Sequence, residues 1–130
     1  MKYVVVIGRI LFSLIFLISG FHHFSSETAG YAASKNVPAA SFLVPVSGIL
    51  AIAGAISIIL GYKARLGAWL IVLFLVPVTL MMHNFWAVTD PAMKQMQMSM
   101  FMKNLSMLGA ALLIAWFGAG PFSLDARRSR

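Results

Sequence analysis

The stretch LGAWLIVLFLVPVTLMMHNFW (Leu66–Trp86) contains no aspartate, glutamate, lysine or arginine. A transmembrane helix needs about 20 mostly apolar residues, and this stretch has that length. Three further apolar runs of similar length lie at Tyr3–Phe24, Ala39–Gly61 and Met98–Phe117. The four runs leave too little of the 130-residue chain for a soluble domain. The sequence therefore predicts an all-α membrane protein that forms one bundle of four transmembrane helices over residues 1–130.

Composition narrows the range of functions. The chain is 61% hydrophobic and 10% charged, and its formal net charge is +7. Because the basic residues lie mostly at the ends of the apolar runs, lipid headgroups and membrane topology explain them better than nucleic acid does. The chain contains no cysteine, which excludes disulfide exchange, thiolate metal ligands and a cysteine nucleophile. No glycine-rich phosphate-binding loop joins a strand to a helix.

The distribution of positive charge predicts the orientation. With four spans, one side of the membrane receives Lys2, Lys63, Arg65, Arg127, Arg128 and Arg130. The positive-inside rule then places both termini in the cytoplasm. In a bacterium this is a multi-pass protein of the plasma (inner) membrane. The first run is expected to be kept as a span rather than removed as a signal peptide, because it exceeds the usual apolar core of about 7–15 residues.

Polar side chains collect where three of the spans reach the outer face. Histidine changes charge near neutral pH and can donate or accept a proton, while lysine and asparagine supply hydrogen-bond donors. A cavity between these helix ends could hold a quinone headgroup. We predict a quinone or ligand site formed by His23, His83, Trp86, Lys103 and Asn104. The alternative is that these residues only occupy the membrane interface, where aromatic side chains are common.

The first apolar run contains one charged residue, Arg9, and this residue lies on a defined helix face. Spacings of four and three positions define this face, which consists of Arg9, Ser13, Phe16, Gly20 and His23. Arg9 lies near the inner surface, so its charge could reach the lipid phosphates. The alternative is a structural ion pair with Asp125, which follows the fourth span on the same side.

Small residues and methionines form two further patterns. The second span has a stripe that predicts close helix packing, consisting of Ser47, Ala51, Gly54, Ile58 and Gly61. Methionines cluster around the start of the fourth span. Because thioethers select Cu(I), Met96 and Met100 with His83 are a candidate site for Cu(I) or Ag(I). Methionine is also an adaptable apolar filler, and we favour that interpretation.

Six segments together resemble the DoxX family of small bacterial membrane proteins. They are RILFSLIFLISGFHHF (Arg9–Phe24), TAGYAASKNVP (Thr28–Pro38), LGYKAR (Leu60–Arg65), HNFW (His83–Trp86), KNLSMLG (Lys103–Gly109) and GAGPFSLD (Gly118–Asp125). The resemblance implies a four-helix bundle in the plasma membrane. Some relatives are subunits of thiosulfate:quinone oxidoreductase, and others are linked to oxidative-stress defence. The resemblance therefore implies a quinone-interacting subunit of a membrane redox complex.

One position departs from the family pattern. Many members have a glutamate in the second span, within a motif like G-x-x-E-x-x-G-G. Here the stretch is GILAIAGA (Gly48–Ala55), with Ala51 where the acid is expected. If that acid relays protons in relatives, this chain lacks the relay. The chain also carries no cofactor-binding fingerprint, so a redox role would require a partner subunit that supplies the electron donor.

Three interpretations stay open. The favoured one is a quinone-binding, non-catalytic subunit, although whether the chain catalyses a reaction of its own is not decided by the sequence. The second is a non-enzymatic membrane assembly or scaffold protein, which would associate stably with another membrane protein or form a homo-oligomer. The third is a methionine-rich tolerance protein that binds Cu(I) or Ag(I).

Overall fold

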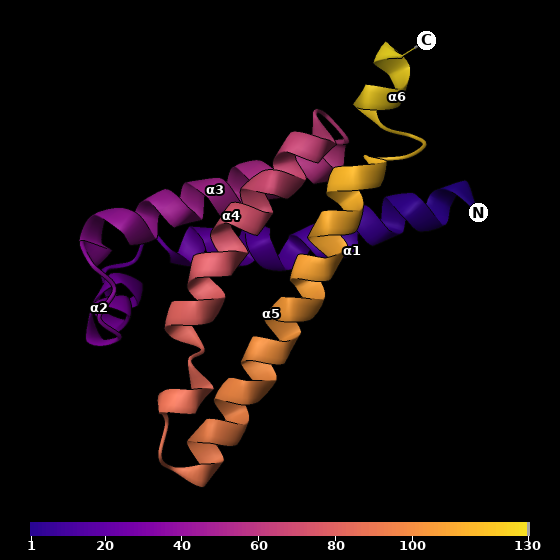
Figure 1. The fold of residues 1–130 in the computed structure, drawn as a ribbon. Coiled ribbons are helices and arrows are strands. Elements are labelled where there is room, and N and C mark those ends of the chain that lie inside the picture. The colour runs from indigo at the N-terminus through magenta and orange to yellow at the C-terminus, as the bar shows by residue number, and fades with distance from the viewer. Residues whose placement is uncertain (130) are drawn as a thin grey trace.

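The computed structural model describes residues 1–129, and every regular element in them is helical (Figure 1). The four long helices are α1 (Lys2–His22), α3 (Ala40–Leu60), α4 (Ala64–Met82) and α5 (Pro91–Phe117). The short elements are α2 (Ser26–Ser34), the 3₁₀ turn η1 (Phe85–Ala87) and α6 (Leu124–Arg128). Each long helix is long and apolar enough to cross a membrane. The predicted fold class, an all-α protein with four transmembrane helices, is confirmed.

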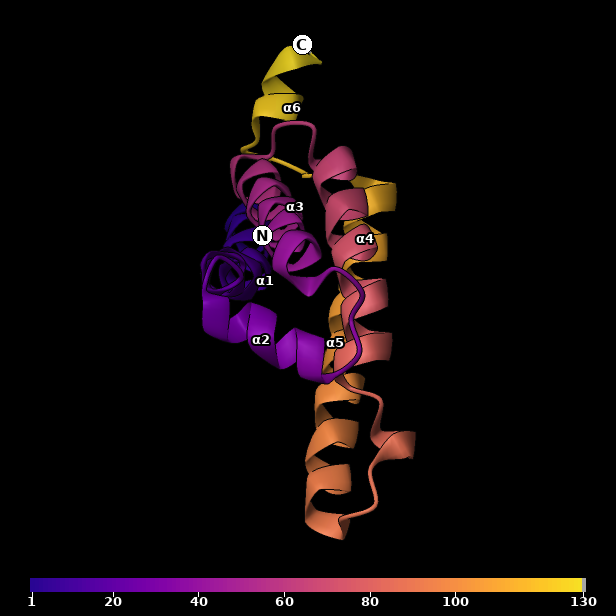
Figure 2. The same ribbon diagram turned by 90° about the vertical axis from the view of Figure 1, so that its left-hand side faces the viewer.

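The long helices pack in chain order. Helix α1 contacts α3, α3 contacts α4, and α4 contacts α5, while α2 lies against α3. The α1–α3 pair crosses the α4–α5 pair obliquely, and the N-terminal part of α5 extends with η1 beyond the other helices (Figures 1 and 2). At 27 residues, α5 is about 40 Å long, which exceeds the roughly 30 Å hydrocarbon layer. A helix of this length either tilts within the apolar layer or extends beyond it.

Helix α5 begins at Pro91, earlier than the predicted start at Met98. The side chain of Asp90 accepts a hydrogen bond of 3.0 Å from the backbone N–H of Met93, and Pro91 occupies the first turn, where its missing N–H costs nothing. The Asp90–Pro91 pair, predicted as a loop turn, is thus the helix N-terminus. This earlier start places Gln97 inside α5.

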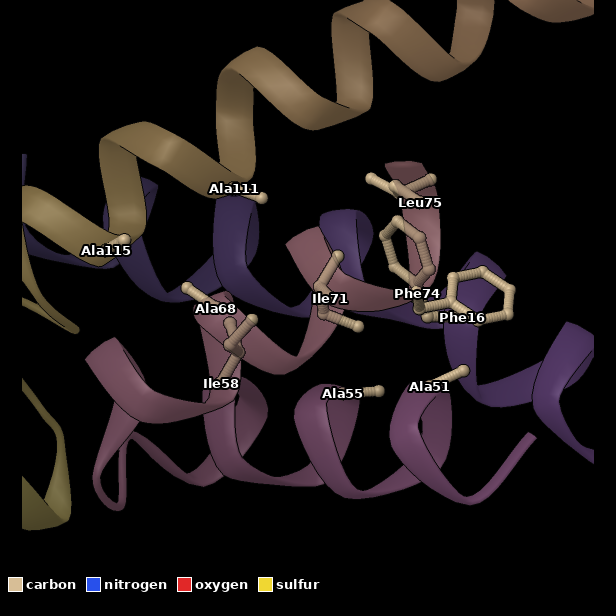
Figure 3. Packing of buried hydrophobic residues seen from close by; sticks show 10 residues of the cluster. All are labelled: Phe16, Ala51, Ala55, Ile58, Ala68, Ile71, Phe74, Leu75, Ala111 and Ala115. Carbon is tan, nitrogen blue, oxygen red and sulfur yellow. The ribbon is translucent and has the colours of Figure 1, made fainter. Parts of the chain in front are cut away.

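Half of the core side chains are alanines, and the other half are large apolar residues (Figure 3). The core consists of Phe16, Ala51, Ala55, Ile58, Ala68, Ile71, Phe74, Leu75, Ala111 and Ala115. The alanines bring the helix backbones close together, as is usual between membrane helices. The rings of Phe16 and Phe74 fill the wider gap between α1 and α4, edge to face at 6.2 Å between centroids.

Two glycine pairs mark the closest helix crossings. A Cβ atom added to Gly48 of α3 would lie 2.7 Å from the carbonyl oxygen of Gly20 in α1. A Cβ atom added to Gly54 of α3 would lie 2.8 Å from the carbonyl oxygen of Gly67 in α4. Because both obstructing atoms belong to the backbone, neither can move aside without shifting a helix. Glycine is therefore required at Gly48 and Gly54 for α3 to pack between its two neighbours.

Candidate functional site

A cavity of about 310 Å³ lies at the end of the bundle that carries α2, here called the α2 end. Residues from the end of α1, from α2, from α3 and from α4 line it. Its walls are mostly aliphatic and aromatic, and its polar lining is limited to His23, Thr28 and Ser47. An apolar cavity with a few converging polar groups is the usual form of a small-molecule site.

His23 follows the last residue of α1 and, within the described part of the chain, is the only titratable side chain that lines this cavity. Its Nδ1 atom lies 2.6 Å from the carbonyl oxygen of Ser19. Because a carbonyl oxygen only accepts hydrogen bonds, Nδ1 must donate, which leaves Nε2 as the ring atom for another partner. The imidazole packs edge to face against Phe74 at 5.4 Å between centroids. The neighbouring His22 is exposed and does not line the cavity.

The two hydroxyl groups of the cavity already have local partners. Ser47 Oγ donates to the carbonyl oxygen of Val44 at 2.6 Å, and Thr28 Oγ1 lies 2.8 Å from Ser25 Oγ. Each hydroxyl oxygen keeps lone pairs that can accept a further hydrogen bond. The cavity can therefore hold an apolar molecule and offer its polar atoms one imidazole and two hydroxyls.

A second cluster of polar residues lies between α4 and α5, on a different side of α4 from the cavity. His83 Nδ1 lies 2.9 Å from Gln97 Oε1, and Asn104 Nδ2 donates to Thr79 Oγ1 at 3.1 Å. Gln97, Asn104 and Thr79 are at most 6% exposed. We call these four residues the α4–α5 polar seam. Because each buried polar group in it has a partner, the seam is suited to holding the two helices in register.

The remaining predicted residues lie on the surface. Lys103 is exposed, and its Nζ donates to Met100 Sδ at 3.5 Å. Trp86 is 55% exposed and packs edge to face on Phe85 and Phe101. Successive residues of a helix point about 100° apart, so the inward direction of Asn104 turns Lys103 away from the helix contact.

The residues of the predicted site therefore lie in three different environments. His23 lines the cavity, His83 and Asn104 belong to the α4–α5 polar seam, and Lys103 and Trp86 are exposed. The sequence indicated that these residues share one end of the bundle, but helix α4 lies between His23 and the seam.

The sequence analysis assigned Ser47 to helix packing and did not predict it as a site residue, nor did it predict Thr28, Thr79 or Gln97. Gln97 was overlooked because α5 was expected to begin after it. The signal that could have found it is its spacing of seven residues from Asn104, which places both on one helix face. Thr79 and Ser47 are single hydroxyls in apolar runs, and such residues usually bond to their own helix.

The opposite end of the bundle holds Arg9, which is only 5% exposed. Its guanidinium donates to the carbonyl oxygens of Ala119 at 2.7 Å and Phe122 at 2.8 Å, with a longer contact of 3.4 Å to Pro121. The face predicted for α1 is confirmed, since Arg9 is buried together with Ser13, Phe16 and Gly20. Arg9 thereby ties α1 to the irregular segment that follows α5.

Asp125 binds different partners from those predicted. Its carboxylate accepts hydrogen bonds from the backbone N–H groups of Lys63 at 2.7 Å and Ala64 at 3.0 Å. Its own N–H donates to the carbonyl oxygen of Gly61 at 2.8 Å. A carboxylate at this position satisfies free N–H groups at the start of α4 and complements the helix dipole. Arg9 and Asp125, predicted as an ion pair, thus each bind backbone groups and both hold the C-terminal segment in place.

The methionines of α5 give a weaker case for metal binding. Met96 and Met100 are 45% and 37% exposed. The Lys103 ammonium group next to Met100 Sδ opposes binding of a second cation there. Within residues 1–129, no group of three or more histidine, cysteine, aspartate or glutamate side chains is placed to hold a metal ion.

Comparison with known proteins places these features in a family context. Residues 1–130 match the SURF4 family. The inner membrane protein YphA of Escherichia coli (strain K12) is 34% identical over 123 residues, which cover 93% of this chain and 87% of that protein. The inner membrane protein YqjF of the same strain is 28% identical over 123 residues, with 93% and 88% coverage. No solved structure matches the chain.

Proposed function

The chain belongs to the SURF4 family, and from that premise we propose that it is a DoxX-type protein that holds a quinone at the α2 end for a membrane redox complex. It is a multi-pass protein of the inner membrane, as its relatives and its four membrane-length helices indicate. The single observation that carries the quinone proposal is the apolar cavity with His23 in its lining.

The cavity suits the size of a quinone headgroup, and the acceptor atoms in its lining suit the hydroxyl donors of the reduced form. A quinone has a flat apolar ring whose carbonyl oxygens accept hydrogen bonds. The volume of about 310 Å³ is at the lower end of the range for small-molecule sites, about 300–1,000 Å³. The headgroup would lie between aliphatic walls, and its isoprenoid tail would extend into the surrounding lipid.

His23 can distinguish the oxidised from the reduced form of such a ligand. With Nδ1 donating to Ser19, a neutral imidazole offers Nε2 as an acceptor for a quinol hydroxyl. A protonated imidazole instead donates from Nε2 to a quinone carbonyl. In this proposal His23 would give or take one of the two protons that accompany two-electron reduction of the quinone, while a partner subunit supplies the two electrons and water at the membrane surface exchanges the second proton.

The other predicted residues take supporting roles in this proposal. His83 and Asn104 hold α4 against α5 through the α4–α5 polar seam. Lys103 and Trp86 lie on the exposed surface of the same end, where a partner subunit would contact the chain. Ala51, which stands where many DoxX-type proteins have glutamate, is fully buried in the core. Proton exchange would therefore depend on His23 rather than on an acid in α3.

Substitutions that fill the cavity or remove its imidazole are expected to lower the amount of bound quinone. We expect Ser47→Leu, which fills the cavity, and His23→Gln, which removes the imidazole, to lower quinone occupancy about tenfold, the effect of losing roughly 1.4 kcal/mol of binding. The measurement is native mass spectrometry of protein extracted from its own membranes in mild detergent. His22→Gln is the matched control, because His22 is exposed on the same turn. Equal losses in His22→Gln and His23→Gln, or a loss confined to His83→Ala, would contradict this site.

A non-enzymatic assembly role is the second candidate function. The observation in its favour is the N-terminal part of α5, which projects with η1 beyond the other helices (Figure 2) and exposes Met93, Met96 and Met102. Such a surface suits contact with another membrane protein or a second copy of the chain. In the same mass measurement, this role predicts a stably bound protein without quinone.

A further inference from the structure

We propose that a groove at the opposite end of the bundle binds the phosphate headgroup of an anionic membrane phospholipid. The groove has a volume of about 590 Å³ and lies between the start of α4 and the segment from Phe117 to Ser129. The lining includes two exposed cations, Lys63 and Arg65. It is separate from the cavity at the α2 end, and the proposal does not depend on quinone binding.

Among the described residues, the groove lining carries two cations and one carboxylate, and its net charge is therefore positive. Among residues 1–129, Asp125 is the only acidic residue that lines it. Both carboxylate oxygens accept hydrogen bonds from backbone N–H groups at the start of α4. The Lys63 and Arg65 side chains make no ion pair with it among the contacts of residues 1–129. An anion in the groove would therefore meet two cations whose donors are not taken up by the Asp125 carboxylate.

The loop after α5 is shaped to leave the Arg65 guanidinium beside the groove. Gly118 has a φ of +81°, a left-handed conformation that side chains rarely adopt. A Cβ atom at Gly118 would lie 3.4 Å from Arg65 Nε. The loop therefore passes beside Arg65 at van der Waals distance, and its positive φ is the reason that glycine is favoured at position 118. Arg65 can present paired N–H donors, which match phosphate oxygens.

The apolar residues around the groove indicate a lipid rather than a soluble anion. Leu66 and Phe117 line the groove and are 56% and 72% exposed. Both belong to membrane-spanning helices, α4 and α5. A phosphate held by Lys63 and Arg65 would leave the acyl chains of the same lipid lying against these two side chains. The Lys63 ammonium group and the Arg128 guanidinium both lie over the Tyr62 ring, at 5.7 Å and 5.5 Å from its centroid, but only Lys63 also lines the groove.

The test compares two double variants that remove the same charge from the same end. Lys63→Gln with Arg65→Gln alters the groove, whereas Arg127→Gln with Arg128→Gln leaves its lining residues unchanged. The purified full chain is mixed with equal amounts of phosphatidylglycerol and phosphatidylcholine, and retained lipids are counted by native mass spectrometry. We expect the groove variant to lose the preference for phosphatidylglycerol about tenfold and the control to keep it within about twofold. Arg65→Gln alone serves if the double variant is unstable.

Two outcomes would overturn the proposal. An equal loss in the groove variant and the Arg127/Arg128 control would show that the attraction is a diffuse effect of net charge. If millimolar inorganic phosphate displaces phosphatidylglycerol as effectively as an excess of the lipid itself does, the groove is a simple anion site. Retention of the lipid in phosphate, combined with its loss only in the groove variants, would support the lipid assignment.

Discussion

Arg9→Met is expected to destabilise the folded protein by about 2–4 kcal/mol, because it leaves the carbonyl oxygens of Ala119 and Phe122 without their charged donors. The guanidinium is buried, so water cannot replace it freely. The segment that follows α5 should then detach from α1. We would measure the loss as a lower melting temperature in detergent and as faster tryptic cleavage at Arg127 and Arg128.

Lys2→Met is the matched control for Arg9→Met, because it removes a positive charge from the same helix at an exposed position. It should leave the melting temperature nearly unchanged. The melting temperature of Arg9→Lys should lie between those of Arg9→Met and Lys2→Met, because one ammonium group cannot reproduce the planar guanidinium that reaches two carbonyl oxygens at once. Equal melting temperatures for Arg9→Met and Lys2→Met would show that the C-terminal segment is held by other contacts.

Gly48→Ala and Gly54→Ala form the second prediction with a large effect. Each added methyl group would lie within 2.8 Å of a backbone carbonyl oxygen in the neighbouring helix. Relief requires α3 to move away from α1 or α4, and overpacking of this kind costs about 1–3 kcal/mol. The melting temperature in detergent should fall for either variant, and the double variant should fold poorly.

Gly109→Ala provides the control for both glycine variants. A Cβ atom at Gly109 would meet nothing within 4 Å, and alanine favours a helix over glycine by about 1 kcal/mol. Its melting temperature should therefore stay the same or rise. A drop in Gly109→Ala as large as that in Gly48→Ala would mean that glycine matters for reasons other than the helix crossings.

The fold could be predicted because a membrane-spanning helix requires a long apolar run, which is easily recognised in a sequence. Four apolar runs of membrane length have few alternative structures, and the buried face of α1 followed from spacings of three and four residues. The start of α5 could not be predicted from hydropathy, since polar residues such as Lys94 and Gln97 resemble a loop. The capping geometry of Asp90 and Pro91, rather than hydrophobicity, sets that boundary.

The candidate sites were harder to predict because their partners are not side chains of opposite charge. Arg9 binds carbonyl oxygens of an irregular segment, and no sequence pattern reports where such oxygens lie. At the other end, the sequence predicted one site for His23, His83 and Asn104 but held no information on their lateral arrangement. Helix α4 separates them, and this follows only from the packing order of the helices.

The most direct test of the proposed function is photochemical cross-linking with an azido-quinone in the protein's own membranes, followed by mapping of the modified peptides. The account predicts labelling of cavity-lining residues in α3 or α4, such as Leu50, Leu73 and Met82. Excess unlabelled quinone should suppress this labelling, and Ser47→Leu should abolish it. Labelling confined to α5 near Gln97 and Asn104, or labelling that excess quinone does not suppress, would contradict the account.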